Sequence, residues 1–397
     1  MAIIIQKFGG TAVATPEGRG ACRRWVGRAL DGGNQVVVVV SAMGRKGSPY
    51  ATDTLIDLAG PVPPRELDLI MACGEIISGV VFQRELLAAG LEAVVLNGAQ
   101  AGITTDGVYN GARIVNIDTT RIRRELEEGK VVIVAGFQGG TPEGEITTLG
   151  RGGSDTTAAA LGVALGAEQV EIYTDVDGIM TADPRIVPEA HVLEELTYRE
   201  IMEMAHLGAK VIHPRAVEIA MQGSIPIVVR SADGQGEGTL IKEWGAGVDI
   251  TGDRVVTGIA HLAPLAQLVI RSRDGSNGQL EYQVFRRLGE AQISVDLIQV
   301  NPGLIAFTIL DNQAKKAAQL LGDLPVDVEI NRQLAKVSVV GGGMRGVPGV
   351  MARVVGALYH AGVTIYQTAD SHANISCLIK AEEVASAVGA LHKEFRL

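Results

Sequence analysis

Short apolar runs rich in valine and isoleucine recur through the first 230 residues of the chain. The runs are continuous rather than alternating, which is typical of strands buried on both faces of a parallel sheet. Amphipathic segments with helical spacing lie between them, so the order predicts a three-layer α/β/α domain with a mainly parallel sheet and right-handed crossovers. The predicted strands are 2–8, 35–43, 91–98, 130–137, 169–176 and 225–231.

The pattern changes after residue 231. Residues 232–262 are rich in glycine and polar side chains, which indicates a linker. Two related segments follow, 266–300 and 335–369, and each reads as a strand, a glycine loop, a helix and a strand. Each copy then adds a strand (304–310 and 374–380) and a helix (312–322 and 381–393). The repeat predicts two ferredoxin-like βαββαβ units, over 263–331 and 332–397.

The second of these units lacks a last strand. The first unit ends with the apolar segment 326–330, whereas the second ends at Leu397 directly after its second helix. A further apolar segment, 254–260, is not used by either copy of the repeat. We therefore expect 254–260 to supply the missing strand, which makes 232–262 both a linker and a spare strand.

Composition and charge exclude several classes of protein. The chain has 397 residues, a formal net charge of −10 and 47% hydrophobic residues, which fits a globular protein of two or three domains without a basic surface for nucleic acid or anionic lipid. The start MAIIIQKFGG lacks the features of a signal peptide, and no apolar run approaches 18 residues. Cys22, Cys73 and Cys377 are widely spaced. These features predict a cytoplasmic protein without disulfides or membrane spans.

One glycine motif matches the sequence pattern of a dinucleotide-binding site. Gly341, Gly343 and Gly346 form GxGxxG after an apolar segment, and Asp370 follows at a suitable distance. Too little chain follows for a dinucleotide-binding domain, and the other copy of the repeat lacks the pattern. We reject that interpretation and assign these glycines to a small-molecule loop in a regulatory unit. No GxxxxGK[ST] motif occurs in the chain.

A second glycine loop, KFGGTA (7–12), closes the first predicted strand and opens a helix. Gly9 and Gly10 allow backbone N–H groups to approach a ligand, and a helix N-terminus favours an anion. Lys7 adds a positive charge at the same place. The alternative interpretation is a tight turn preceded by an ordinary lysine at the end of a strand.

A third loop, GRGGSD (150–155), has the same construction and adds a carboxylate. Arg151, Ser154 and Asp155 can face a ligand at the start of a helix. Alternatively, Ser154 or Asp155 caps the helix and Arg151 is solvated. Neither interpretation is excluded by this stretch alone.

Two further clusters follow predicted strands or helices. In YTDVDGIMTADPR (173–185), Thr174 and Asp175 stand at the carboxyl edge of a strand, where open α/β sheets bind ligands, and Arg185 can reach a phosphate. The string DVDG is not a calcium loop, because the required acidic spacing is absent. GAKVIHPRA (208–216) places Lys210 at a helix end, where the alternative is dipole compensation. His206 and His213 read as structural.

The clusters agree with one another. Two lysines, two arginines and two glycine loops fall at the same predicted edge of one sheet in an acidic protein. Phosphoryl transfer needs such an arrangement, because cations, backbone N–H groups and a metal ion stabilise the charge on the transferring oxygens.

Taken together, the motifs resemble those of the aspartokinases. KFGGTA, SAMG (41–44), ATDTL (51–55), CGE (73–75), GRGGSD, YTDVDGIMTADPR and GAKVIHPRA occur in that order. The resemblance implies an amino-acid-kinase domain over 1–231, with the repeat forming tandem ACT domains. It also implies transfer of the γ-phosphoryl group of ATP, with Mg, to the side-chain carboxylate of L-aspartate, the first step towards lysine, diaminopimelate, threonine and methionine.

The resemblance also implies a role for individual residues. Lys7, Asp155 and Lys210 would be catalytic, with Asp155 orienting the two lysines. Aspartate would be held by side chains that include Arg151 at its α-carboxylate and Glu75 at its ammonium group. The complete aspartate set is Thr52, Glu75, Phe137, Arg151 and Ser154, and the ATP set is Lys7, Phe8, Gly9, Gly10, Ser41, Thr174, Asp175, Met180, Arg185 and Lys210.

The chain departs from the family pattern in two places. Ala12 stands where the family usually has serine, so any hydrogen bond from that hydroxyl is lost. The loop 44–53 resembles that of isozymes inhibited by diaminopimelate, which leaves lysine, threonine or diaminopimelate as the effector. The resemblance places the effector between ACT domains paired in a homo-oligomer, unless one pair of loops is only an interface. The predicted effector residues are Asp274, Gly275, Gly346, Val347 and Pro348.

Two alternatives stay open at this point. Another carboxylate kinase of the same fold, such as a glutamate kinase, would share the first domain but usually lacks the repeat. A catalytically inactive amino-acid sensor would keep the repeat, but it would have no physical reason to retain Lys7, Arg151, Asp155 and Lys210.

Overall fold

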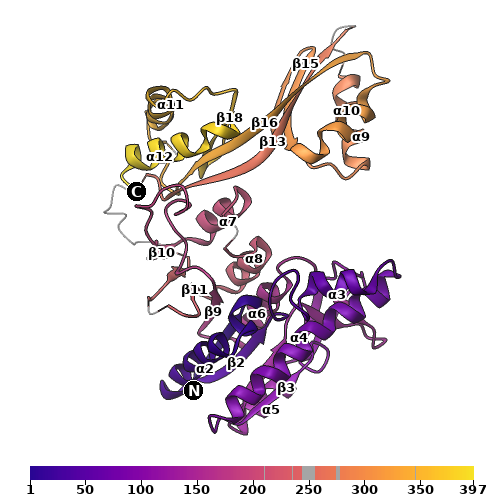
Figure 1. Cartoon of the computed structure of the whole chain (residues 1–397), viewed down its shortest axis with the longest axis vertical. Coiled ribbons are helices and arrows are strands. Elements are labelled where there is room, and N and C mark those ends of the chain that lie inside the picture. The colour runs from indigo at the N-terminus through magenta and orange to yellow at the C-terminus, as the bar shows by residue number, and fades with distance from the viewer. Residues whose placement is uncertain (210, 235, 244–254, 274–277, 345) are drawn as a thin grey trace. The chain divides into compact units, whose positions relative to one another are not determined.

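The computed structural model describes residues 1–209, 211–234, 236–243, 255–273, 278–344 and 346–397 (Figure 1). The chain divides into two compact units. The first comprises Met1–Ile179, Val192–Ala205 and the described part of 210–249, and the second comprises Met180–His191, His206–Ala209 and the described part of 250–397.

The first unit is built on an eight-stranded sheet of order β10-β12-β11-β9-β1-β2-β6-β3. Six of its strands are the apolar runs predicted from the sequence, and they pair in parallel with one another. They are β1 (Ile3–Phe8), β2 (Gln35–Val40), β3 (Ala93–Leu96), β6 (Val131–Ala135), β9 (Gln169–Thr174) and β11 (Ile227–Ser231). Two short strands, β12 (Thr239–Ile241) and β10 (Glu195–Leu196), extend the sheet beyond β11. The predicted linker 232–262 therefore contributes a strand, β12, to this sheet.

Helices cover both faces of this sheet, as the three-layer prediction requires. On one face, α2 (Pro16–Asp31) and α4 (Pro64–Leu87) pack against each other and against the strands, and on the other lie α6 (Gly153–Leu165) and α8 (Pro214–Gly223). Phe8 lies in the core under α2 and α4. Because side chains alternate along a strand, its neighbour Lys7 points to the opposite face, towards α6.

A second, four-stranded sheet of order β5-β4-β7-β8 extends the first unit. It joins segments that lie between the larger strands in sequence, and the apolar pattern did not predict it. Its strands are β4 (Ile103–Thr105), β5 (Ile114–Ile117), β7 (Gln138–Gly140) and β8 (Ile146–Thr148). The remaining helices of this unit are α1 (Gly10–Ala14), α3 (Thr52–Ala59), α5 (Thr120–Glu127) and most of α7 (Tyr198–His206).

The second unit is one six-stranded antiparallel sheet of order β14-β15-β13-β16-β18-β17 with helices from both repeats. Its two long central strands each serve both halves of the repeat, so the two predicted ferredoxin-like units share a single sheet. Its elements are β13 (Gly258–Ser272), α9 (Gln279–Glu290), β14 (Asp296–Asn301), β15 (Leu304–Leu310), α10 (Ala314–Leu321), β16 (Val326–Val340), α11 (Val350–His360), β17 (Gln367–Asp370), β18 (Asn374–Lys380) and α12 (Val384–Phe395).

The spare strand completes the second ferredoxin-like half. Residues 258–262 at the start of β13 pair with 336–340 of β16, whereas the rest of β13 pairs with 326–334 of β16, with irregular register around Leu265, and with β15. The expectation that 254–260 supplies the missing strand is therefore confirmed for 258–260. Residue 254 lies outside the described residues.

A segment from the middle of the predicted kinase domain packs in the second unit. Ala182, Val187 and Ala190 belong to the same buried cluster as residues of β16, α11 and α12. The backbone N–H of Ile259 donates to the Thr181 carbonyl oxygen at 2.8 Å, and Thr181 Oγ1 lies 3.0 Å from Nε2 of His392 on α12. The range 1–231 expected for the first domain therefore includes a segment, Met180–His191, that belongs to the second unit.

Candidate active site

A pocket of about 590 Å³ lies in the first unit, where the loops after β1, β2 and β8 meet α4 and α6. It brings together most of the residues predicted to hold aspartate and the phosphates. The predicted residues that line it are Lys7, Gly10, Ser41, Thr52, Glu75, Phe137, Arg151, Ser154 and Asp155. All five predicted aspartate residues are therefore in one cavity.

Lys7 and Asp155 form an ion pair at this pocket. The Lys7 Nζ atom, at the end of β1, lies 2.7 Å from Asp155 Oδ1 in the first turn of α6, and the two side chains are 12% and 14% exposed. The two side chains are therefore in contact, as the orienting role predicted for Asp155 requires. The Phe8 side chain is not part of the site, because its ring is fully buried against Phe82 and Tyr173. Only the backbone of Phe8 can take the predicted role in binding ATP.

The KFGG loop approaches the loop after β2 closely. A Cβ atom at Gly10 would lie 2.4 Å from the Ala42 carbonyl oxygen, so only glycine fits here. The Gly44 N–H donates to the Gly10 carbonyl oxygen at 2.9 Å, which fixes the two loops together. Gly9 is the N-terminal cap of α1, next to Lys7.

Glu75 supplies a buried carboxylate with one oxygen unsatisfied. It lies on α4 and is only 3% exposed. Its Oε1 accepts a hydrogen bond from the Ala42 N–H at 3.0 Å, whereas Oε2 has no hydrogen-bond partner among the residues that the structure describes. Burial raises the pKa of Glu75 to about 8, although the Ala42 hydrogen bond acts in the opposite direction. A cationic ligand would satisfy the free oxygen and favour the ionised form.

The GRGGSD loop and Phe137 form the opposite wall. Phe137 adopts a left-handed backbone conformation (φ 70°), and its N–H donates to Thr157 Oγ1 of α6 at 3.1 Å. Ser154 is buried, and a side chain at Gly136 would collide with it. Arg151 is exposed and forms no ion pair with any described residue, so its guanidinium is available to a carboxylate.

Most of the predicted nucleotide residues beyond the glycine loops do not line this pocket. Thr174 ends β9, and Asp175 forms an ion pair with Arg45. Met180 and Arg185 belong to the second unit, where Arg185 pairs with Asp183 at 2.7 Å. Lys210 lies outside the described residues.

The described effector residues lie in one loop of the second unit. Gly346, Val347 and Pro348 connect β16 to α11, with Gly346 in a left-handed conformation (φ 77°) and Val347 exposed. The glycines of the GxGxxG motif fall in this same connection. Asp274 and Gly275, predicted for the equivalent loop of the first repeat, lie outside the described residues.

Four residues that were not predicted as site residues also shape the pocket, one of which, Arg215, lies in the motif GAKVIHPRA. Asn110 and Thr148 line it directly. Asp68 is fully buried beneath it, and Arg215 donates to the carbonyl oxygens of Leu149 and Ala112 at 3.1 and 3.2 Å. Besides the motif around Arg215, a signal was available for Asp68, which precedes Glu75 by about two helical turns on α4 and so shares its face.

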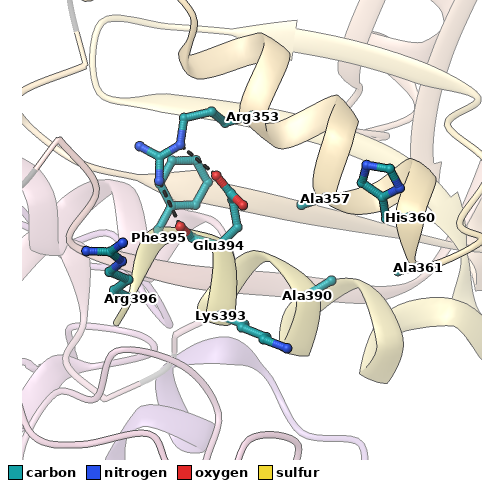
Figure 2. A pocket seen from close by; sticks show the side chains of 9 residues that line it. All are labelled: Arg353, Ala357, His360, Ala361, Ala390, Lys393, Glu394, Phe395 and Arg396. Atoms are coloured by element: carbon teal, nitrogen blue, oxygen red, sulfur yellow. Dashed lines mark hydrogen bonds and ion pairs between the residues drawn. The ribbon is translucent and has the colours of Figure 1, made fainter.

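A larger hollow of about 790 Å³ lies between α11 and α12 (Figure 2). Arg353 lines this hollow and is held by two contacts. Its Nε lies 2.7 Å from Glu394 Oε1, and its Cζ lies 4.4 Å from the centroid of the Phe395 ring. None of the predicted site residues within the described ranges lines this hollow. Its size exceeds that of the pocket around Lys7, but Arg353 is already paired with Glu394, and neither of the two glycine loops of the Lys7 pocket lines it.

Neither a protein metal cage nor a membrane span is present in the described parts of the chain. No cluster of three or more His, Cys, Asp or Glu side chains among the described residues has the geometry to hold a metal ion. The helices of the described ranges are also too short or too polar to cross a bilayer.

Comparison with known proteins identifies the family. Residues 2–231 match the Amino acid kinase family, and residues 329–393 match an ACT domain. Aspartokinase 1 of Bacillus subtilis is 46% identical over 404 residues, covering 100% of both chains. The structure is similar to E. coli aspartokinase III with aspartate and ADP (TM-score 0.80, 26% identity, 100% of both chains) and to the same enzyme with lysine and aspartate (TM-score 0.78, 26% identity, 99% of both chains). The chain therefore belongs to the aspartokinase family, the ATP-dependent kinases that phosphorylate the side-chain carboxylate of L-aspartate.

Proposed function

We propose that the pocket around Lys7 and Asp155 is where this aspartokinase binds L-aspartate and receives the γ-phosphoryl group of ATP. The ion pair between these two residues, at the mouth of two glycine loops, is the observation that carries the proposal. It puts a fixed ammonium group where a transferring phosphoryl group would have to be neutralised. The unsatisfied oxygen of Glu75 in the same pocket adds a place for the ammonium group of an amino acid.

The pocket offers a complementary group for each charge of aspartate. Glu75 takes the substrate ammonium, and Arg151 takes its α-carboxylate through a two-pronged hydrogen bond. Ser154 and Thr52 donate hydroxyl hydrogen bonds, while Phe137 closes one wall. This arrangement leaves the side-chain carboxylate of the substrate directed towards Lys7.

The reaction needs no general base. The attacking carboxylate of aspartate is already ionised at neutral pH, so its oxygen forms the new bond to the γ-phosphorus directly. The bond between that phosphorus and the bridging oxygen of ADP breaks, and ADP leaves with the electron pair. Lys7 neutralises the transferring oxygens, and the backbone of Gly9 and Gly10 lines their path. Positioning and charge neutralisation thus supply the catalysis.

Mg²⁺ enters this scheme with the nucleotide. The family uses ATP with Mg²⁺, an ion that typically retains several waters and is bound by substrate phosphates with one or two carboxylates. Asp155 is the carboxylate at this pocket next to Lys7, so it is the side chain that would meet such an ion. When bound, Mg²⁺ neutralises charge on the phosphates.

The other nucleotide assignments are proposals from the family resemblance. Ser41 would contact the phosphates, and Thr174, Asp175, Met180, Arg185 and Lys210 would contact ATP. Asp175 is at present paired with Arg45. A nucleotide that uses Asp175 therefore has to displace or share this arginine.

Regulation is proposed to act through the ACT domains. An amino-acid effector, which can be lysine, threonine or diaminopimelate, would bind at the loop containing Gly346, Val347 and Pro348, with the equivalent loop of the first repeat (Asp274, Gly275) as the alternative or additional place. ACT domains of two copies would pair to form a homo-oligomer. We also place the protein in the cytoplasm, because its reaction draws on the ATP pool.

One assay separates this function from the alternatives. Purified protein is incubated with ATP, Mg²⁺ and either L-aspartate or L-glutamate, and the acyl phosphate is trapped with hydroxylamine. Hydroxamate from aspartate alone is expected. Hydroxamate from glutamate would indicate another carboxylate kinase, and no product from either amino acid would indicate an inactive amino-acid sensor.

A further inference from the structure

Asp68 is a buried carboxylate that lies next to the pocket but does not line it. It stands on α4 about two turns before Glu75, and none of its side chain is exposed. No described Lys, Arg or His side chain lies within ion-pair distance of it. A carboxylate in such a place must be satisfied by hydrogen-bond donors, because burying it without partners is costly.

The donors come from two segments that are far apart in sequence. The Asn110 N–H lies 3.1 Å from Oδ1 and 3.0 Å from Oδ2 of Asp68. The Thr148 N–H donates to Oδ2 at 2.8 Å, and the Thr148 hydroxyl donates to Oδ1 at 2.8 Å. Each carboxylate oxygen therefore meets one donor from the loop between β4 and β5 and one from the end of β8.

Both of these partners are walls of the aspartate pocket. Asn110 and Thr148 line the cavity together with Glu75 and Arg151. Asn110 is held in a left-handed backbone conformation (φ 62°), and its carbonyl oxygen would lie 3.3 Å from a Cβ atom at Gly150. Asn110 therefore packs against Gly150, the residue that precedes Arg151. A shift of Asn110 or Thr148 would displace the loop that carries the Arg151 guanidinium.

We propose that Asp68 is a positioning residue for aspartate binding: it holds the Asn110 and Thr148 walls against the loop of Arg151. The inference rests on the proposed aspartate pocket and adds a residue that does not touch the substrate. Glu75 and Asp68 then have different roles on the same face of α4. Glu75 binds the substrate, and Asp68 holds the opposite walls of the pocket in place.

The test is the isosteric substitution Asp68→Asn. An amide has one acceptor oxygen and one donor nitrogen, so either orientation places an NH₂ group against an N–H donor. Loss of one buried hydrogen bond corresponds to about a tenfold change in affinity. We expect the KM for aspartate to rise about tenfold, the KM for ATP to stay within about twofold and kcat to change less than the aspartate KM.

Asp106→Asn is the matched control. Asp106 lies on the same loop and accepts hydrogen bonds from the N–H groups of Val108 and Arg113, but it is exposed and does not line the pocket. The control should leave both KM values unchanged. An unchanged aspartate KM in folded Asp68→Asn, or equal changes in both KM values, would overturn the proposal.

If Asp68→Asn does not fold, a second pair of variants tests the same hydrogen bonds from the side of Thr148. Thr148→Val preserves shape but removes the hydroxyl donor to Asp68, and Thr148→Ser restores it. The aspartate KM should rise in the valine variant and return towards the wild-type value in the serine variant; no rise with valine would overturn the proposal. Wild-type protein that forms no hydroxamate from aspartate would instead refute the proposed function itself.

Discussion

The Lys7 ammonium lies 2.7 Å from the Asp155 carboxylate, although Lys7 is near the end of the first strand and Asp155 is in the first turn of α6, far along the chain. Both side chains are largely buried, yet both line the pocket. The pair therefore presents an oriented positive charge to a ligand rather than a solvated lysine. This geometry connects the two glycine loops into a single site.

Replacement of Lys7 tests whether that charge acts in the transition state. In Lys7→Met the transferring phosphoryl group loses its ammonium, and kcat should fall by about 100- to 1,000-fold with a smaller change in the aspartate KM. Steady-state kinetics of hydroxamate formation measures both quantities. Lys130→Met is the control, because Lys130 pairs with Glu125 and Glu128 away from the pocket. Comparable kcat values in the two variants would refute the role of Lys7.

The pKa of Glu75 predicts how aspartate binding depends on pH. Burial raises this pKa to about 8, whereas binding of the substrate ammonium requires the ionised carboxylate. The affinity for aspartate should therefore increase as the pH rises from 6 towards 8 and level off above it. Calorimetric titration at several pH values measures this. Glu75→Gln should bind weakly at every pH in this range, and a wild-type affinity that does not vary with pH would contradict the assignment.

The same pKa has a consequence for stability. The folded pKa lies above the unfolded value, so Glu75 takes up a proton on folding at intermediate pH. Its contribution to the free energy of unfolding is fully present below about pH 4.5 and is lost as the pH rises towards 8. In Glu75→Gln this pH-dependent loss should disappear, which denaturant unfolding at pH 5.5 and 8 can measure without substrate. An identical pH dependence in both proteins would contradict the burial argument.

The buried histidine of the second unit predicts the opposite pH dependence. Burial lowers the pKa of His392, nearby His191 lowers it further and Glu189 opposes the shift. Because the folded pKa is below the unfolded value, stability is greatest above about pH 6.5 and falls as the pH drops through the folded pKa. His392→Gln keeps a polar partner for Thr181 and should weaken this fall in thermal unfolding. His360→Gln, an exposed change on α11, should leave the fall intact.

Gly10 tests the close approach of the two loops. A Cβ atom there would lie 2.4 Å from the Ala42 carbonyl oxygen and 2.9 Å from that of Gly44, so Gly10→Ala must separate the loops. We expect at least about a tenfold loss of kcat/KM, since small misplacements of reacting groups cost up to about 100-fold. Gly20→Ala in α2 meets no atom within 4 Å and should be neutral or stabilising. Equal activity in both variants would contradict this account of the loop.

The sequence predicted the elements whose signals are local. The buried parallel strands stood out as continuous apolar runs, and the repeat revealed both ferredoxin-like halves. It did not predict that β13 and β16 each run through both halves, because this sharing depends on pairing between distant segments. The strands of only two or three residues, such as β10 and β12, carry too little hydrophobic pattern to be recognised in the sequence.

The site residues with a local sequence signal were also predicted, whereas those that depend on contacts between distant segments were not. Glycine loops next to charged residues identified Lys7, Arg151 and Asp155, and the family resemblance added Glu75. Phe8 was assigned with its motif, but strand alternation directs its ring into the core. Asp68 was not predicted because its partners are the backbone N–H groups of Asn110 and Thr148 and the Thr148 hydroxyl, whose positions no sequence pattern reports.

The most direct test of the central claim is hydroxamate formation from aspartate by Asp155→Ala. Asp31→Ala, a change at the exposed end of α2, is the control. The pairing of Asp155 with Lys7 predicts that Asp155→Ala forms hydroxamate at less than about one hundredth of the wild-type rate while its circular dichroism spectrum is unchanged. A folded Asp155→Ala protein that works at a rate close to that of the wild type would contradict the assignment of this pocket as the phosphoryl-transfer site.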